Sequence, residues 1–190
     1  DAKGFTPIVH LPARTMRDID HVENFLINIR KLTKSDNILV IGGGGNQAGS
    51  IQSSMDILES GLLEKYNFNK VKVAGHPEGS PDIDDETLKK FLLAKEQIHS
   101  ARVLDLEIVT QFFFEAEPFI KWDALLDTIG VTLPVRVGFP GPATFKTLLN
   151  FGLMSGVGNS LNFLKKNSNK IGDLLVKTTN DKLLMELVSA

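Results

Sequence analysis

Residues 38–42 read Ile38-Leu39-Val40-Ile41-Gly42, a short apolar run that breaks off into glycine. Four further runs of this kind recur at intervals of roughly thirty residues, namely Pro7-Ile8-Val9-His10, Val71-Lys72-Val73-Ala74-Gly75, Leu106-Glu107-Ile108-Val109-Thr110-Gln111 and Val135-Arg136-Val137-Gly138-Phe139-Pro140. Strands of a parallel sheet are buried on both faces and are joined by crossovers of a dozen or more residues. The spacing therefore predicts an α/β protein with a parallel sheet.

The segments between these runs carry apolar residues at the three-and-four spacing of half-buried helices. The predicted helices cover residues 17–32, 53–63, 84–102, 118–129, 144–153, 161–166 and 171–190. Gly61 is a weak point near the end of the second helix, whereas Asp84-Asp85-Glu86 suits the dipole at the start of the third.

Five β/α units without an internal break predict a single domain over residues 1–190. A doubly wound sheet and a TIM-type β/α barrel share this local pattern. The even repeat, and the absence of a glycine fingerprint after the first strand, favour the barrel. A closed barrel has eight strands in about 250 residues. We therefore expect about five to six of its β/α units here, either in an open sheet or in a part of a longer protein.

Composition excludes several classes of function. The chain has no cysteine, which rules out disulfides, thiolate nucleophiles and cysteine-based metal sites. A formal net charge of −2 and the lack of a long basic block argue against nucleic acid as a partner. No apolar stretch approaches the ~20 residues that span a bilayer. We expect a cytoplasmic protein with no membrane partner.

Ligands of such sheets bind at the carboxyl ends of the strands. The residues that the sequence places there are His10, Gly42–Gly45, His76, Gln111 and Phe139. Gln111 comes last in its run, so its amide can offer a donor and acceptors to a planar heterocycle. A glutamine in this position can equally satisfy nearby loop backbone, and the residues alone leave both interpretations open. Phe112-Phe113-Phe114 is expected to pack in the core and at its rim.

Two other strand ends carry candidate residues. Gly42-Gly43-Gly44-Gly45 could bring backbone N–H groups close to a phosphate, but it matches neither the P-loop nor the dinucleotide fingerprint, and a flexible turn explains it equally well. His76 and Glu78 could serve acid–base chemistry or bind ribose hydroxyls. No metal is expected there, because only the distant His10 is available as a third ligand. Lys95, on the following helix, could reach a phosphate, although a solvated helix lysine is the simpler interpretation.

Together these strand ends resemble the methylenetetrahydrofolate reductase family, the flavin-dependent barrel enzymes of one-carbon metabolism. The segments that carry the resemblance run through nearly the whole chain and are 8–14, 37–43, 73–78, 108–114 and 134–141. Ile108-Val109-Thr110-Gln111-Phe112-Phe113-Phe114 is the most specific of them and the glycine run the least. The stretch Gly156-Val157-Gly158-Asn159-Ser160-Leu161 looks like a bacterial branch of that family.

The resemblance implies a set of ligand-binding residues. FAD would contact His10, Ile41, Gly42, Gly43, Gly44, His76, Glu78 and Lys95. The folate would contact Gln111, which would hydrogen-bond the pterin or the nicotinamide in turn. Phe145 would pack against the folate or against the adenine side of the pyridine nucleotide. The resemblance further implies NADH or NADPH as the reductant, a tetrahydrofolate derivative as the substrate, and hydride transfer through the flavin. The subunit number stays open, with a homo-oligomer as one option.

The sequence departs from the family pattern in two ways. Gly42-Gly43-Gly44 stands where the family usually has Arg-Gly-Asp, whose arginine contacts the flavin phosphates and whose aspartate tunes the flavin ring. The family's proton-donating glutamate belongs to the first barrel strand, and this chain aligns from the third, so no catalytic residue is assigned. We therefore expect a fragment without the first two strands and the last strand, or an incomplete structure.

Three functions follow as expectations. The leading one is reduction of methylenetetrahydrofolate to methyltetrahydrofolate by a flavin enzyme with a nicotinamide donor. The second is a relative that binds folate, or folate and flavin, without reducing it, in a methyl-transfer pathway; Gly42 and Gly44 favour this option. The third is an unrelated open-sheet phosphate-binding domain. All folate-based options require the strand ends to converge on one flat aromatic ligand.

Overall fold

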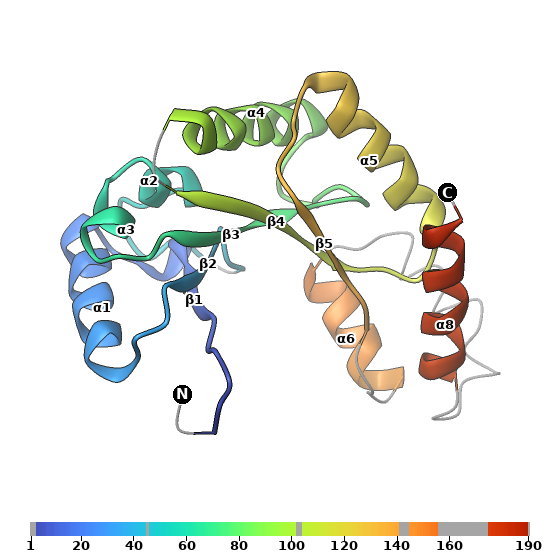
Figure 1. Cartoon of the computed structure of the whole chain (residues 1–190), viewed down its shortest axis with the longest axis horizontal. Coiled ribbons are helices and arrows are strands. Elements are labelled where there is room, and N and C mark those ends of the chain that lie inside the picture. Colours follow the sequence, from blue (N-terminus) through green and yellow to red (C-terminus); the bar gives the residue numbers. More distant parts are fainter. Residues whose placement is uncertain (1–2, 45, 102–103, 141–144, 156–174, 190) are drawn as a thin grey trace. The chain divides into compact units, whose positions relative to one another are not determined.

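A computed structural model describes residues 3–44, 46–101, 104–140, 145–155 and 175–189. Five parallel strands form one sheet in the strictly sequential order β1-β2-β3-β4-β5, and helices flank it (Figure 1). The strands are β1 (Val9–Pro12), β2 (Asn37–Ile41), β3 (Lys70–Gly75), β4 (Asp105–Phe112) and β5 (Val135–Gly138). The predicted α/β fold with a parallel sheet is confirmed.

The helices agree with the predicted segments except in one place. They are the 3₁₀ turn η1 (Ala13–Thr15), α1 (Ile19–Leu32), α2 (Ser54–Leu58), α3 (Leu62–Lys65), α4 (Asp85–Ala101), α5 (Ala116–Ile129), α6 (Phe145–Ser155) and α8 (Leu175–Val188). The single helix predicted over 53–63 is wrong, because Gly61 adopts the left-handed conformation with φ of 77° and separates α2 from α3. The helix predicted over 161–166 lies outside the described residues.

Side chains cap the starts of α1, α2 and α4. The Asp18 carboxylate accepts a hydrogen bond from the His21 N–H at the start of α1. Ser53 and Asp56 form a reciprocal capping box on α2. Asp84 accepts hydrogen bonds from the backbone N–H and the hydroxyl of Thr87 at the start of α4, and these bonds lower the pKa of Asp84. No described helix is long and apolar enough to cross a membrane.

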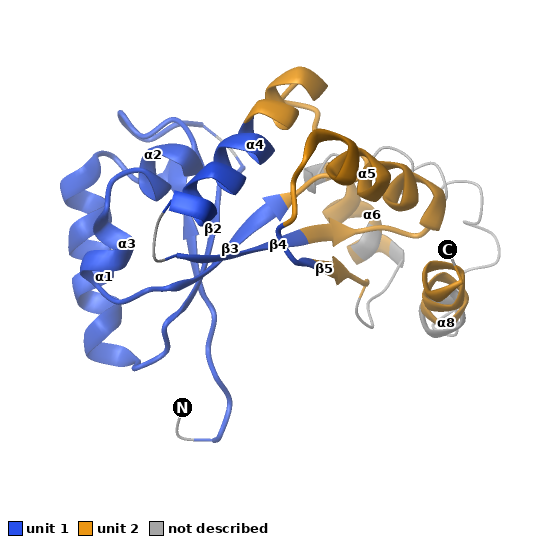
Figure 2. Ribbon diagram, turned by 45° about the horizontal axis from the view of Figure 1, so that its top comes forward, with its two compact units in different colours: residues 1–74, 91–109, 133–135 blue, residues 75–90, 110–132, 136–190 orange. Residues whose placement is uncertain are grey.

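Contacts divide the chain into two compact units, which are coloured separately in Figure 2. Unit 1 consists of residues 1–74, 91–109 and 133–135, and unit 2 of residues 75–90, 110–132 and 136–190. The expectation of one domain stays a prediction.

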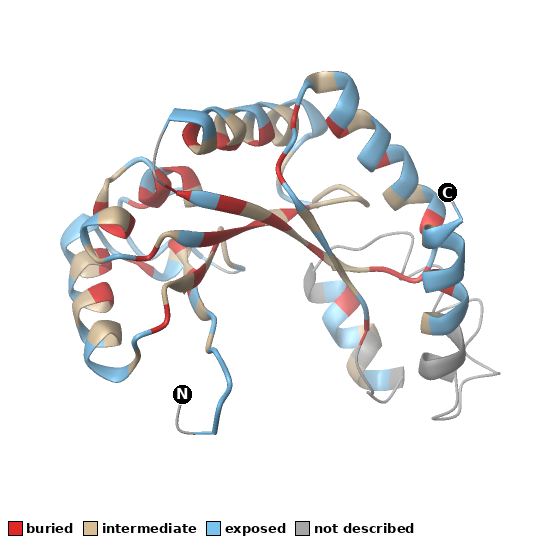
Figure 3. Ribbon diagram, viewed as in Figure 1, coloured by how far each residue is buried: buried red, intermediate tan, exposed pale blue. Residues whose placement is uncertain are grey.

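The core of unit 1 lies on one face of its strands, under the helices. Val40 pairs with Leu11 of β1 and with Val73 of β3. The alternate residues on this face are fully buried, namely Leu11, Ile38, Val40, Val71, Val73, Leu106 and Ile108 (Figure 3). Helix α2 contacts β2, and residues of α1, α2 and α3 are fully buried in the same unit, including Leu26, Ile57 and Leu63. This face is the helix-covered face.

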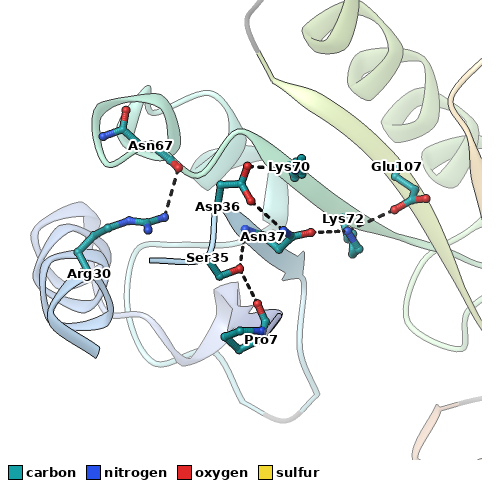
Figure 4. A network of polar contacts seen from close by, with 9 residues as sticks. All are labelled: Pro7, Arg30, Ser35, Asp36, Asn37, Asn67, Lys70, Lys72 and Glu107. Carbon is teal, nitrogen blue, oxygen red and sulfur yellow. Dashed lines mark hydrogen bonds and ion pairs between the residues drawn. The ribbon is translucent and has the colours of Figure 1, made fainter. Parts of the chain in front are cut away.

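The opposite face of the same strands is more polar. Lys72 of β3 donates a hydrogen bond to Asn37 Oδ1 of β2 over 3.1 Å, and its Nζ lies 3.3 Å from Glu107 Oε2 of β4. Figure 4 shows this chain of contacts, which continues from Asn37 to the Ser35 hydroxyl. The Lys72 and Glu107 side chains are only 10% and 18% exposed. Three neighbouring strands are therefore tied together by a largely buried polar network.

Unit 2 has a core of its own between the end of β4, β5, α5 and α8. Phe113, Ala116 and Leu183 are buried there, and Phe119, Val137 and Leu187 pack against them. The Phe113 and Phe119 rings stack with centroids 5.3 Å apart. Phe113 and Phe114 are buried, as the sequence predicted for this stretch.

Candidate functional site

The carboxyl ends of β1 and β2 are joined by their following loops within unit 1. The Arg14 N–H donates a hydrogen bond to the Gly42 carbonyl over 2.9 Å, and the Ala48 N–H donates one to the Arg14 carbonyl over 2.8 Å. The Ser50 N–H also donates to the Arg17 carbonyl. The glycine loop after β2 is therefore fastened at both ends to the turn after β1, which argues against a loose connection.

The structure requires glycine at some positions of this loop but not at others. Gly43 has φ of +83°, and a Cβ there would lie 3.0 Å from the Pro12 Cβ. A Cβ at Gly49 would lie 2.0 Å from the Arg17 carbonyl oxygen. By contrast, a Cβ at Gly42 or Gly44 would meet nothing within 4 Å. Backbone geometry and packing thus require glycine at 43 and 49, but not at 42 or 44.

Among the described residues, the N–H groups of Gly43 and Gly44 have no hydrogen-bond acceptor. Unpaired N–H groups in a turn with a left-handed residue are suited to an anion such as a phosphate. Residues 41–44, which are predicted to contact FAD, therefore lie on a loop that is held by hydrogen bonds and that has N–H donors available. His10 is less well placed than predicted, because β1 continues through Leu11 to Pro12 and His10 is not its last residue.

Lys95 is the most unusual charged residue of unit 1. It is only 5% exposed, in contrast to the solvated lysine that the helix pattern suggested. Its Nζ donates a hydrogen bond to the Ala74 carbonyl, near the end of β3, over 3.2 Å. Burial lowers the pKa of Lys95 from its ordinary value of 10.5 to about 8. No carboxylate pairs with this ammonium group in the described part of the chain.

Unit 2 contains the turn after β3. The Gly79 N–H donates a hydrogen bond to the His76 carbonyl over 3.0 Å, and Gly79 has φ of +80°. Pro77 in the second position and glycine in the fourth favour such a turn. His76 and Glu78 are both half-buried on it. This hydrogen-bonded turn therefore fixes the backbone of His76 and Glu78, as a binding site at a strand end requires.

The ends of β4 and β5 carry the remaining candidates of unit 2. Gln111 is the penultimate residue of β4 and is half-buried. Phe139 follows the last residue of β5 and is 37% exposed. The Phe145 side chain, predicted to contact folate, lies outside the described residues. No set of three His, Asp or Glu side chains in the described ranges could hold a metal ion.

Asn180 of α8 is a polar residue that the sequence analysis did not single out. Its Nδ2 donates a hydrogen bond to the Pro140 carbonyl, two residues beyond β5, over 2.8 Å. Its Oδ1 is buried and has no hydrogen-bond partner among the described residues. Nothing in the local sequence marks it, because an asparagine within a predicted helix is ordinarily a surface residue.

The ion pair between Lys72 and Glu107 was also not predicted, although the sequence contains a signal for it. Each interrupts an otherwise apolar strand, between Val71 and Val73 and between Leu106 and Ile108. A buried charge requires a partner, so two such charges on neighbouring strands could have been paired from the sequence.

No family model matches this sequence.

Proposed function

We propose that this chain is the flavin- and folate-binding part of an oxidoreductase similar to methylenetetrahydrofolate reductase, with FAD as cofactor and NADH or NADPH as reductant. The observation that carries the proposal is the buried ammonium group of Lys95. An isolated charge in a protein interior is costly unless a counter-charge or hydrogen bonds offset the loss of water. Within the described residues one carbonyl oxygen contacts this group, at the end of a strand where ligands bind. An anionic cofactor would supply the missing charge.

The glycine loop supports an anionic cofactor independently. The N–H groups of Gly43 and Gly44 are unpaired in the described structure, and the loop that carries them is held by the Arg14 hydrogen bond to Gly42. FAD has two phosphates, which fit an ammonium group and backbone N–H donors of unit 1. The residues present therefore fit the phosphate part of the cofactor.

The order of the strands supports a β/α barrel as the complete fold. Crossovers between parallel strands are right-handed in nearly all proteins. In a sheet of sequential order, such crossovers place every helix on the same face, whereas a doubly wound sheet reverses its order and has helices on both faces. The observed order β1-β2-β3-β4-β5 and the apolar helix-covered face agree with the barrel.

The residues of unit 2 would serve the folate. The Gln111 amide offers both a donor and acceptors, which suit the edge of a pterin ring or of a nicotinamide. His76 and Glu78 would contact the ligands from the turn after β3. When bound, FAD supplies the hydride chemistry, and the protein orients the reactants and tunes them. A cytoplasmic location and a tetrahydrofolate derivative as substrate belong to this proposal.

A second candidate is a protein that binds folate without reducing it. The observation that favours it is the open space at Gly42 and Gly44. A Cβ at either position would meet no neighbouring atom, so crowding at the Cβ does not explain the loss of the family's Arg-Gly-Asp motif. If the protein binds flavin and folate but transfers no hydride, the double variant Gly42→Arg/Gly44→Asp is expected to gain reductase activity.

Flavin content tests the proposal. The purified full-length protein is expected to carry FAD, with its yellow absorbance, in near-equal amount to protein. Lys95→Met is expected to lower FAD affinity at least about tenfold, the effect of losing one charge-assisted contact. Lys90→Met, an exposed lysine on the same helix, is the matched control and should bind FAD as the parent does. A colourless parent protein that fails to take up added FAD would contradict the proposal.

A further inference from the structure

Helix α8 packs next to the carboxyl ends of β4 and β5 within unit 2. Leu183 is 1% exposed and is buried with Phe113, which follows β4. Val137 of β5 packs against the same cluster, as does Leu187. The helix is therefore anchored through Leu183 and Leu187, and Asn180 lies three positions before Leu183 on this anchored helix.

The orientation of the Asn180 amide is fixed by its one hydrogen bond. Its partner, the Pro140 carbonyl, can only accept, so the NH₂ group must face Pro140 and the oxygen must face elsewhere. That oxygen, Oδ1, is buried without a donor among the described residues. Native structures pair the great majority of buried polar atoms. The unpaired Oδ1 therefore indicates a donor that a ligand brings.

The position of this acceptor agrees with a ligand site. Pro140 follows β5 by two residues, and ligands of parallel sheets bind beyond the carboxyl ends of the strands. Phe139, the residue between β5 and Pro140, is 37% exposed and offers an aromatic surface at the same strand end. An acceptor and an aromatic side chain at the same strand end suit a flat heterocycle that carries N–H groups.

We propose that Asn180 Oδ1 accepts a hydrogen bond from the amino group of the pterin at the end of β5. This inference rests on the proposed folate-binding function and adds a positioning residue from α8 to it. The pterin carries an amino group on one edge, which is the kind of donor that the unpaired oxygen requires. Asn180 would thus select ligands that present an N–H donor at this edge.

A comparison of two ligands tests the assignment. Binding of tetrahydrofolate and of its 2-desamino analogue is measured by calorimetry with the full-length protein. The parent should bind tetrahydrofolate about tenfold more tightly than the analogue, the effect of one hydrogen bond to a buried group. Asn180→Ala should lose this preference and bind the two ligands equally. Asp181→Asn, the exposed neighbour on α8, is the control and should keep it.

The outcomes separate this inference from the proposed function. A parent that binds tetrahydrofolate while Asn180→Ala retains the full preference overturns the role of Asn180 and leaves the function in place. A parent that binds no tetrahydrofolate overturns both. Should Asn180→Ala fail to fold, Asn180→Ser decides, because it keeps a small polar side chain at this position while it no longer extends an amide oxygen.

Discussion

Replacing Lys95 by methionine should have opposite effects on the cofactor-free protein and on cofactor binding. Lys95 is 5% exposed, and burial lowers its pKa from 10.5 to about 8. One pKa unit corresponds to about 1.4 kcal/mol, so keeping Lys95 charged costs the folded protein on the order of 3 kcal/mol at pH 7. The hydrogen bond from Lys95 to the Ala74 carbonyl stabilises the folded parent by roughly 1 kcal/mol, and the variant loses this contribution. Lys95→Met should therefore stabilise the cofactor-free protein by about 2 kcal/mol at pH 7.

The pH dependence of this difference follows from the direction of the pKa shift. Between about pH 8 and pH 10.5 the unfolded chain holds the Lys95 proton more tightly than the folded protein does. Stability rises with pH wherever the unfolded state binds more protons. From pH 7 to pH 10 the parent should thus gain about 2 kcal/mol relative to Lys95→Met, and the advantage of the variant should disappear.

Urea unfolding of both proteins at pH 7 and pH 10 measures this change. Comparing the two proteins at each pH removes the contribution of the other titrating groups. A saturating anionic cofactor should raise the pKa of Lys95 and abolish the pH dependence, while the same cofactor concentration should stabilise the variant by about 1.4 kcal/mol less than the parent. A stability difference that is the same at both pH values would refute the buried, unpaired state of Lys95.

Three further predictions concern the folate contact, the glycine loop and the polar network. Gln111→Ala should weaken folate binding and turnover while FAD content stays nearly intact; equal folate affinity in variant and parent would contradict that role. Gly49→Ala should lower the free energy of unfolding by about 1–3 kcal/mol because its Cβ would overlap the Arg17 carbonyl, whereas Gly44→Ala should change it by less than about 0.5 kcal/mol. Lys72→Met should lower the free energy of unfolding in urea by about 3 kcal/mol because it breaks a largely buried ion pair with Glu107, and Lys72→Met/Glu107→Leu should recover most of that loss. A double variant as unstable as the single one would show that the ion pair is not the cause.

The five strands and most helices could be predicted from the sequence because their signals are local. Apolar runs and helical spacing located every strand within two residues. The helix predicted over 53–63 failed at Gly61, where a left-handed backbone outweighed the apolar spacing. The first strand was placed two residues early because Pro7 and Ile8 are apolar, yet pairing with β2 begins at Val9.

The site was harder to predict because burial and pairing depend on residues distant in sequence. Lys95 has the pattern of a surface lysine, and its burial depends on the packing of α4 against β3. The need for glycine at Gly49 comes from the Arg17 carbonyl. The pairing of Asn180 with Pro140 joins residues on either side of a long segment. Whether the strand ends converge on one ligand stays a prediction.

Stopped-flow spectroscopy of the full-length protein tests the proposed function most directly. Mixing with NADH or NADPH should bleach the flavin absorbance, and a second mixing with methylenetetrahydrofolate should restore it at a rate that depends on folate concentration. Bleaching without restoration would contradict the proposed reductase and would leave the non-reducing folate-binding protein as the better account.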